Sequence, residues 1–314
     1  MRALAALLLA TMVGTASAAA AADKVRVGKS VSQPFAFVPL EIGAAEGIWA
    51  KHDLEVETVV FAGDAKLQQG LVANSVDFGL GSGPAMGFLA KGVPAKAVGA
   101  LANEPLSLGL IVGASPAIQK PEDLKDARIG VTTAGSLSYW LVRELSRKLG
   151  WGPTGIEPVA LGAMAAMLAA LKRGQVDGVI LSSSQAYGLE QTGNGRLLLK
   201  FGTYITDFHT HVMFATDAMI KDKPDQVRRF LAGWRDVVAF MAANKAETVR
   251  VAKAVTGLEE AIESREYDDV MPMMSRDLRF HAKALDVIGD SFPEMDILPT
   301  KPDMHALYTE EFLN

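Results

Sequence analysis

The second half of the chain repeats a pattern of the first half about 100 residues later, and this repeat constrains the fold most strongly. The segment LVANSVDFGLGS at 71–82 has a counterpart, LKRGQVDGVILS, at 171–182, and four of their twelve positions are identical. The shorter segment RVGKS at 26–30 is matched by RIGVT at 128–132. The order and spacing predict two similar folding units. Short strand–helix–strand patterns also converge between unrelated units, so coincidence is the alternative interpretation.

Each unit alternates strand-like segments with segments of helical periodicity. In the first unit we expect strands at 24–31, 54–61, 76–80 and 95–102 and helices at 39–50, 64–73 and 84–90. The second unit restarts with expected strands at 128–132 and 156–161. Such alternation predicts an α/β fold with mostly parallel sheets covered by helices.

From residue 223 onward the pattern contains helices without intervening strands. We expect helices at 224–244 and 245–255, followed by further helical segments. Helices alone cannot build a third α/β lobe, so we expect them to pack on the first one. Met271, Met273 and Met274 lie here, and core packing is the common role of such residues, with copper binding as the alternative.

The N-terminus has the layout of a secretory signal peptide. Met1 and Arg2 precede an apolar run, and a small-residue tract with two A-x-A patterns follows. The apolar stretch at 3–13 is shorter than the ~20 residues that a membrane-spanning helix needs. We therefore predict a cleaved signal peptide at 1–22 and an extracytoplasmic location. A lipid anchor would need a cysteine, and the chain has none.

Composition excludes several classes of function. The chain has 31 basic and 36 acidic residues, and this balance gives no electrostatic footprint for nucleic acid. The absence of cysteine excludes disulfides, cysteine-ligated zinc and a thiolate nucleophile. We expect no cofactor, no nucleic-acid partner and a monomeric protein.

Small and hydroxyl residues follow the predicted strands, where ligands bind in open parallel sheets. These strand ends are 32–35, 63–64, 81–84, 135–139, 162–164 and 182–185. Each serine also has an ordinary interpretation as a helix N-cap. No Lys or Arg lies directly at these ends except Lys29, which falls within a strand. An anion would therefore be held by backbone N–H groups and hydroxyls, and a neutral or aromatic ligand fits equally well.

Motifs for catalysis and metal binding are incomplete. The segment GLGSG at 79–83 places its serine one position late for a nucleophile elbow. With Gly87 it approaches a dinucleotide fingerprint but has one extra residue. Asp207, His209 and His211 share one face of a strand-like segment by parity, which makes a metal site the alternative to hydrogen-bonded histidines. We predict no catalytic residues and no metal site.

Three segments carry a family resemblance. They are PLEIGAAEGIWAKHDL at 39–54, QGLVANSVDFGLGSG at 69–83 and GVPAKAVGA at 92–100. In this order and spacing the chain resembles the solute-binding proteins of nitrate/sulfonate/taurine-type ABC importers, a group that also includes thiamine-pyrimidine binders. The resemblance covers about residues 24–255.

The resemblance implies the fold of type II periplasmic binding proteins, with two α/β lobes, a central ligand cleft and C-terminal helices packed on the first lobe. It places the crossovers between the lobes near 103–110 and 203–211. The first lobe is expected at 23–106 and 209–314, and the second at 107–208. The ligand contacts that it implies are Ser32, Gln33, Phe35, Ser82, Gly83, Gly135, Ser136, Tyr139, Ser183 and His209.

The function implied by the resemblance is capture of a small organic solute by hinge closure and delivery to an inner-membrane ABC permease. Sulfonates, carboxylates and aromatic or heterocyclic compounds are the candidate ligands. One alternative is an enzyme of the same fold, of the pyrimidine- or menaquinone-precursor type. The pyrimidine synthases have cysteine-rich motifs and no export signal, unlike this chain. A ligand sensor for a membrane kinase is the second alternative.

Overall fold

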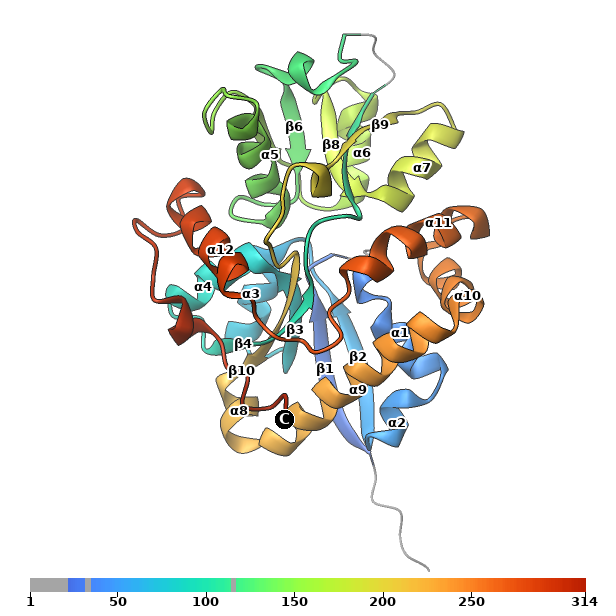
Figure 1. The fold of residues 1–314 in the computed structure, drawn as a ribbon, viewed down its shortest axis with the longest axis vertical. Helices are drawn as coiled ribbons and strands as arrows, with labels where there is room; N and C mark the ends of the chain where they lie inside the picture. Colours follow the sequence, from blue (N-terminus) through green and yellow to red (C-terminus); the bar gives the residue numbers. More distant parts are fainter. Residues whose placement is uncertain (1–21, 32–34, 114–116) are drawn as a thin grey trace, which may run out of the picture.

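Two separate five-stranded sheets form the centres of two lobes (Figure 1). The computed structural model describes residues 22–31, 35–113 and 117–314. Most of the signal peptide predicted at 1–22 lies outside these residues. The first sheet contains β1 (Asp23–Lys29), β2 (Leu54–Val60), β3 (Phe78–Ser82), β4 (Ala95–Ala102) and β10 (His211–Thr216). The second contains β5 (Leu108–Val112), β6 (Arg128–Val131), β7 (Glu157–Ala160), β8 (Gly178–Ser182) and β9 (Arg196–Lys200).

The strand order is the same in both lobes. The first sheet runs β2-β1-β3-β10-β4 and the second β7-β6-β8-β5-β9, and in each the fourth strand is antiparallel to its neighbours. The reversed direction of this strand follows from the path of the chain. Both β5 and β10 follow a crossing between the lobes, so each enters its sheet from the cleft side, whereas the other strands run toward the cleft. The predicted mostly parallel sheets therefore each contain one reversed strand.

Asp77 and Asp177, which stand at equivalent positions of the sequence repeat, make the same contact in both lobes. Asp77 accepts a hydrogen bond from the backbone N–H of Arg26 at 2.8 Å. Asp177 accepts one from the N–H of Arg128, also at 2.8 Å. Each thereby holds the start of its third parallel strand against the first one, β1 or β6. The sequence repeat thus corresponds to a repeated structural unit.

Helices cover both sheets near the cleft and at the flanks (Figure 1). The first lobe has α1 (Pro39–Ala45), α2 (Ile48–Lys51), α3 (Asp64–Val72) and α4 (Met86–Ala90), and the second has α5 (Leu137–Lys148), α6 (Met164–Lys172) and α7 (Ser183–Gln191). The single helix predicted at 39–50 is wrong, because the chain breaks it into α1 and α2. Gly47 takes a φ of +62° between them, a left-handed conformation that ends the first helix and redirects the second.

The C-terminal helices pack on the first lobe as predicted. They are α8 (Asp217–Asp222), α9 (Pro224–Ala243), α10 (Lys245–Thr256), α11 (Glu260–Val270) and α12 (Ala282–Glu294). The long α9 buries one face against α1 and α2, and α11 also contacts α7 of the second lobe. Met273 and Met274 are buried in the first lobe's core, and Met271 packs against it, so these methionines fill the core.

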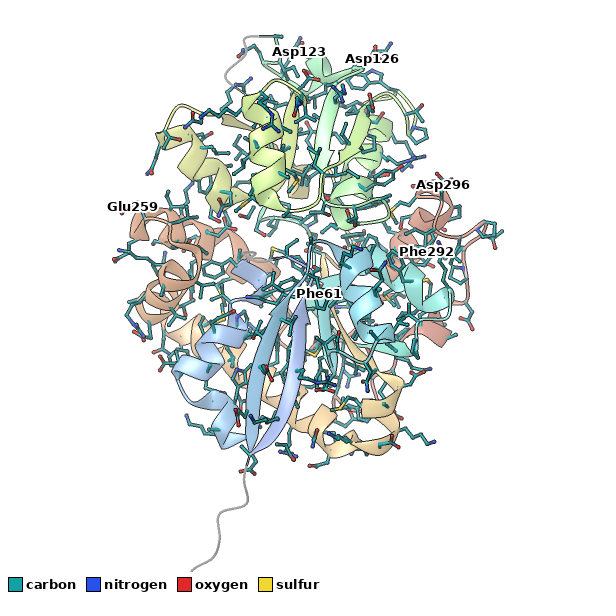
Figure 2. The ribbon with its side chains drawn as sticks, turned by 180° about the vertical axis from the view of Figure 1, so that it is seen from behind. Phe61, Asp123, Asp126, Glu259, Phe292 and Asp296 are labelled. Carbon is teal, nitrogen blue, oxygen red and sulfur yellow. The ribbon has the colours of Figure 1, made fainter. Side chains whose placement is uncertain are left out.

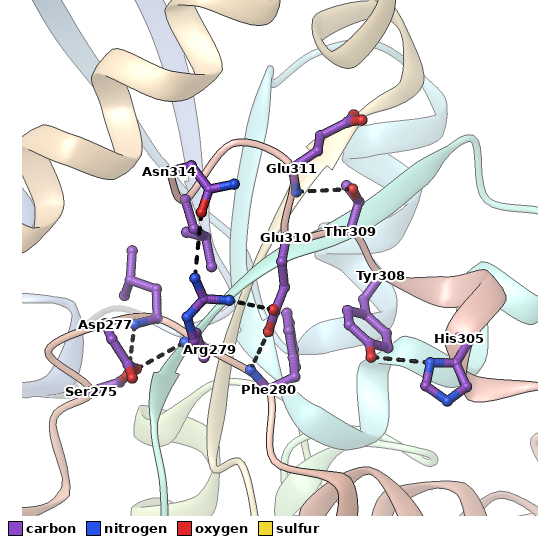
Figure 3. Close-up of polar contacts among 12 residues, drawn as sticks. Ser275, Asp277, Arg279, Phe280, His305, Tyr308, Thr309, Glu310, Glu311 and Asn314 are labelled. Atoms are coloured by element: carbon purple, nitrogen blue, oxygen red, sulfur yellow. Dashed lines mark hydrogen bonds and ion pairs between the residues drawn. The ribbon is translucent and has the colours of Figure 1, made fainter.

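A cluster of polar contacts around Arg279 and Glu310 holds the C-terminal tail in place (Figure 3). Arg279 donates to the Glu310 carboxylate at 2.8 Å, and the N–H of Phe280 donates to the other oxygen at 2.8 Å. The N–H of Thr309 reaches the carbonyl of Ala97 at 2.9 Å and joins the tail to β4. The tail is therefore an integral part of the first lobe.

Aromatic packing joins α9 to the first sheet. The fully buried Phe230 ring lies 5.2 Å from Trp49 of α2 and 4.4 Å from Phe78 of β3, measured between ring centroids. Three elements that are distant in sequence thus meet at one side chain.

Replacing Phe230 by Ala should lower the free energy of unfolding by about 3–5 kcal/mol, because it removes a buried ring and leaves a cavity among Trp49 and Phe78. Denaturant unfolding of the purified chain measures this. The control Val72→Ala changes a side chain that is 57% exposed and should cost less than about 0.5 kcal/mol. Similar losses in both variants would contradict this account of the core.

Candidate ligand-binding cleft

A cavity of about 370 Å³ lies between the two lobes. Its volume is within the range of small-molecule sites in proteins. Figure 2 shows Phe61, one of the lining residues, at the junction of the lobes. The remaining lining residues are Ser30, Val31, Val60, Ala62, Gly63, Asp64, Ser82, Leu108, Thr132, Leu137, Ser138, Gly162, Ala163, Met164, Met167, Ile180, Leu181, Ser182, Gln185 and His211.

The residues that form the wall of the cavity lie at the carboxyl ends of the parallel strands. Residues after β1, β2 and β3 supply the first lobe's side, and residues after β6, β7 and β8 supply the second lobe's side. The first turns of α3, α5, α6 and α7 meet there as well. This is the edge at which open α/β sheets bind ligands.

Asp64 is buried at the first turn of α3 and faces the second lobe. Its carboxylate accepts hydrogen bonds from the N–H of Ser82 at 3.1 Å and from the Ser82 hydroxyl at 2.9 Å. The hydroxyl of Ser30 and the N–H of Leu137, the first residue of α5, also donate to it. Burial raises the pKa of Asp64, and these donors act in the opposite direction. The carboxylate therefore caps a helix of the opposite lobe.

The lobes approach closely beside Asp64. Gly63 has a φ of +104°, and a Cβ at this position would lie 2.9 Å from Cγ2 of Thr133 in the second lobe. A side chain here would push the lobes apart, so glycine permits the contact. The structure thus has its lobes closed against each other at this rim.

His211, the first residue of β10, lines the cavity and is 5% exposed. Its ring packs against Phe37 with a centroid distance of 4.7 Å. Neither ring nitrogen makes a hydrogen bond of regular geometry with a described residue. Burial lowers the pKa of His211 to about 4, with the Gly81 carbonyl acting in the opposite direction, so the imidazole is uncharged at neutral pH. The Gly81 carbonyl faces one ring nitrogen, and the other nitrogen lies in the cavity wall without a partner among the described residues.

His209 is buried two residues earlier but has a different environment. Its Nε2 accepts a hydrogen bond from the N–H of His281 at 2.9 Å, so this nitrogen carries no proton. Nδ1, 3.1 Å from Oδ1 of Asn103, must then carry the proton and donate it. Burial is the main cause that lowers the pKa of His209 to about 4, and the charge of His281 adds to it. His209 links the crossover segments to the C-terminal region.

Of the ten ligand contacts implied by the family resemblance, eight lie in the described residues, and Ser82 is the one that lines the cavity. Ser32 and Gln33 fall outside the described residues. Phe35 is buried in the first lobe's core, where its ring meets the edge of Tyr267. Gly83 packs against the carbonyl of His209.

The predicted residues of the second lobe lie just behind the wall. Ser136 is the N-cap of α5 and accepts from the N–H of Tyr139 at 3.4 Å. Gly135 packs against Ile297. The Tyr139 hydroxyl accepts from Arg143 at 3.2 Å, and the Ser183 hydroxyl is buried without a hydrogen bond to a described residue. The ligand contacts remain predictions.

The segments predicted at the carboxyl ends of the strands contain more of the cavity-lining residues than the contacts implied by the family resemblance do. Asp64, Ser138, Met164 and Gln185 all lie in these segments, and all line the cavity. For His211 the sequence predicts a hydrogen-bonded histidine, with metal binding as the alternative, and no place in this wall. Among residues 22–31, 35–113 and 117–314, no three His, Asp or Glu side chains are grouped to hold a metal ion. Asp207, His209 and His211, which parity places on one face as the alternative metal site, form no such group there.

Residues 35–248 match the protein family described as NMT1/THI5 like. No curated protein matches the sequence significantly. Across the part of the chain that the structure describes, no helix is long and apolar enough to span a membrane.

Several solved structures share the fold. The alkanesulfonate-binding protein SsuA of Xanthomonas axonopodis pv. citri, bound to MOPS, has a TM-score of 0.79 at 20% identity, covering 91% of this chain and 98% of that one. The CA3427 gene product of Candida albicans has a TM-score of 0.78 at 17% sequence identity, and the match covers 92% of this chain and 96% of that one. The nitrate-binding protein NrtA of Synechocystis PCC 6803 has a TM-score of 0.72 at 15% sequence identity, and the match covers 92% of this chain and 86% of that one. The predicted two-lobe periplasmic binding protein fold is confirmed.

The His209 contacts predict a specific pH dependence of stability. The pKa of His209 in the folded state, about 4, lies below the ordinary value of 6.5. Between pH 6.5 and pH 4 the unfolded chain therefore binds a proton at this residue that the folded chain does not bind. The free energy of unfolding consequently falls as the pH falls through this range. At pH 5 this histidine should lower the free energy of unfolding by about 2 kcal/mol relative to pH 7.5.

The variant His209→Leu isolates this contribution from other buried groups. It should be less stable than the parent chain at pH 7.5, because the Asn103 and His281 groups lose their partner. The stability difference between the two proteins should narrow by about 2 kcal/mol at pH 5. Denaturant unfolding at both pH values measures this. If the two proteins lost the same free energy of unfolding between pH 7.5 and pH 5, the lowered pKa of His209 would not be the cause.

Proposed function

The chain belongs to the NMT1/THI5-like family, and we propose that it is an extracytoplasmic solute-binding protein that captures a small organic molecule for an ABC importer. The observation that carries this proposal is the cavity between the lobes, whose wall comes from both of them. A ligand held there contacts both lobes and therefore favours the closed arrangement over an open one.

The connection between the lobes suits a hinge. The chain leaves the first sheet after Ala102, enters the second at Leu108, and returns between Thr203 and His211. The two crossing segments lie side by side. The carbonyl of Asn103 accepts from the N–H of Thr210 at 2.9 Å and from its hydroxyl. Two short paired segments can absorb the changes in φ and ψ that rigid lobes need to open.

Polar contacts hold the lobes together at the α7–α11 rim. Asp269 of α11 accepts from the Tyr187 hydroxyl at 2.8 Å and pairs with Lys200 at 2.6 Å. The guanidinium of Arg265 lies 3.5 Å above the Tyr187 ring. Tyr187 and Lys200 belong to the second lobe's elements, whereas α11 packs on the first lobe. Opening of the cleft would separate these groups.

The arrangement of the polar groups in the cleft favours binding over catalysis. The Ser82 hydroxyl donates to Asp64 and not to an imidazole, so it does not belong to the serine–histidine pair that is typical of activated serine nucleophiles. We therefore propose that the protein makes and breaks no covalent bond. The signal peptide predicted at 1–22 would direct it to the periplasm, where an inner-membrane ABC permease is the proposed partner of the monomer.

If the protein is a solute receptor, a small molecule should copurify with it from its native host. Mass spectrometry after denaturation should release one compound in stoichiometric amount. Adding it back to the stripped protein should reduce the radius of gyration in solution scattering and raise the Tm, since ligand at 100 times its Kd contributes about 2.7 kcal/mol. A protein that carries no compound and does not close with any candidate solute would contradict the proposal.

The rim contacts should contribute to ligand affinity through the closed state. Asp269→Asn removes the charge that pairs with Lys200 and should weaken ligand binding about fivefold, equivalent to about 1 kcal/mol. Isothermal titration with the copurified compound measures this. The control Asp268→Asn, on the same helix, breaks a contact with Lys245 that lies outside the cleft. Equal affinities of the two variants would show that the rim contacts do not stabilise closure.

A further inference from the structure

The cavity wall indicates which class of ligand it takes. Resting on the proposed function, we propose that the ligand is an uncharged molecule with an apolar, aromatic-sized body and one polar group that hydrogen-bonds to His211. The proposal depends on three observations: the wall is largely apolar, two of the four helix N-termini at the cavity face carboxylates of this chain, and one ring nitrogen of the buried His211 has no partner among the described residues.

Apolar side chains form opposite walls of the cavity. Val31, Val60 and Phe61 come from the first lobe, and Leu108, Met164 and Ile180 come from the second. Met167 lies beside Met164, and thioethers contact aromatic rings favourably. A ligand clamped between these walls loses its water on both faces, so an apolar body gains free energy there.

The described lining residues contain no Lys or Arg. Lys29, the basic residue that precedes this edge of the sheet, is buried and paired with Glu41 at 2.6 Å. A sulfonate or carboxylate would leave water without gaining an ion pair, which is costly in a closed cavity. It would also approach the Asp64 carboxylate. The wall therefore disfavours anions.

Two helix N-termini of the second lobe face carboxylates of the first. At α5 the N–H of Leu137 donates to Asp64. At α7 the N–H of Ser184 faces Glu266 of α11, a buried carboxyl group whose pKa is raised well above its ordinary value mainly by burial. Helix N-termini are common anion sites, and in the closed lobes these two already have an acidic side chain of the same chain. An anionic ligand at either of these two N-termini would have to displace the acidic side chain.

His211 supplies the polar contact. It is 95% buried, lines the cavity and makes no regular hydrogen bond with a described residue. A buried unpaired polar group destabilises a protein unless something else satisfies it. With the N–H of the neutral imidazole directed to the Gly81 carbonyl, the other ring nitrogen can accept from an amide or hydroxyl. An uncharged ligand with such a group satisfies it without bringing a charge into the cleft.

Four compounds with one naphthalene skeleton test the charge preference: 2-naphthamide, 2-naphthoate, naphthalene-2-sulfonate and 2-naphthylmethylammonium. Isothermal titration of the stripped full chain should show the amide binding at least tenfold more tightly than each charged compound. Tightest binding of either anion would overturn the inference, and so would tightest binding of the ammonium, which would assign recognition to Asp64. Failure of all four to bind would also overturn it.

Variants of His211 test the polar contact. His211→Leu should weaken amide binding about tenfold, because it removes the ring nitrogen that accepts the hydrogen bond of the ligand. His211→Gln retains a donor and an acceptor and should recover part of the affinity. The control His52→Leu changes a histidine paired with Asp236 on the first lobe and should leave binding unchanged. Full affinity in His211→Leu would overturn the assignment.

The outcome also separates this inference from the proposed function. A copurified anion, or closure of the lobes around one of the charged naphthalenes, would overturn the inference and still support a solute receptor. A chain that carries no compound and never closes would instead contradict the receptor function itself.

Discussion

The insertion of β10 between β3 and β4 is the constraint on which the rest of the structure depends. After crossing back from the second lobe, the chain enters the middle of the first sheet, pairing His211 with Ser82 and with Ala102. This pairing ties the return segment to the strand from which the chain departed, so the two crossings run together as a hinge. It also places the first residue of β10 in the wall of the cleft. Lobe connection and ligand recognition therefore share one strand.

Carboxylates of the first lobe occupy positions that a ligand anion would otherwise take. Asp64 and Glu266 face the first turns of α5 and α7, and burial raises the pKa of both. Their burial is unfavourable by itself, and backbone N–H groups of the opposite lobe offset part of this cost. The contacts help to close the lobes while they remove anion sites.

The outline of the fold could be predicted from sequence because it depends on local patterns. Strand and helix alternation, the 100-residue repeat and the helices after residue 223 all reappear in the structure. The failures occurred where one residue changes the chain direction. Gly47 divides a predicted helix, and Asp207, with a φ of +51°, interrupts the extended run before β10 begins at His211. Because the run is not a strand at Asp207 and His209, the parity that grouped three metal ligands does not apply.

The sequence by itself determined the two-lobe α/β architecture and the sheet edge where the site lies, since periodicity and turn residues are local properties of the chain. Only the tertiary structure decided which side chains reach the cavity. His209 and His211 are nearly adjacent in sequence, yet His209 bonds to Asn103 and His281 with both ring nitrogens, while His211 lines the cleft with one nitrogen free of described partners. The difference arises because segments distant in sequence satisfy both nitrogens of His209 but not of His211. Such long-range packing sets which polar groups are satisfied, and hence which one is left for a ligand.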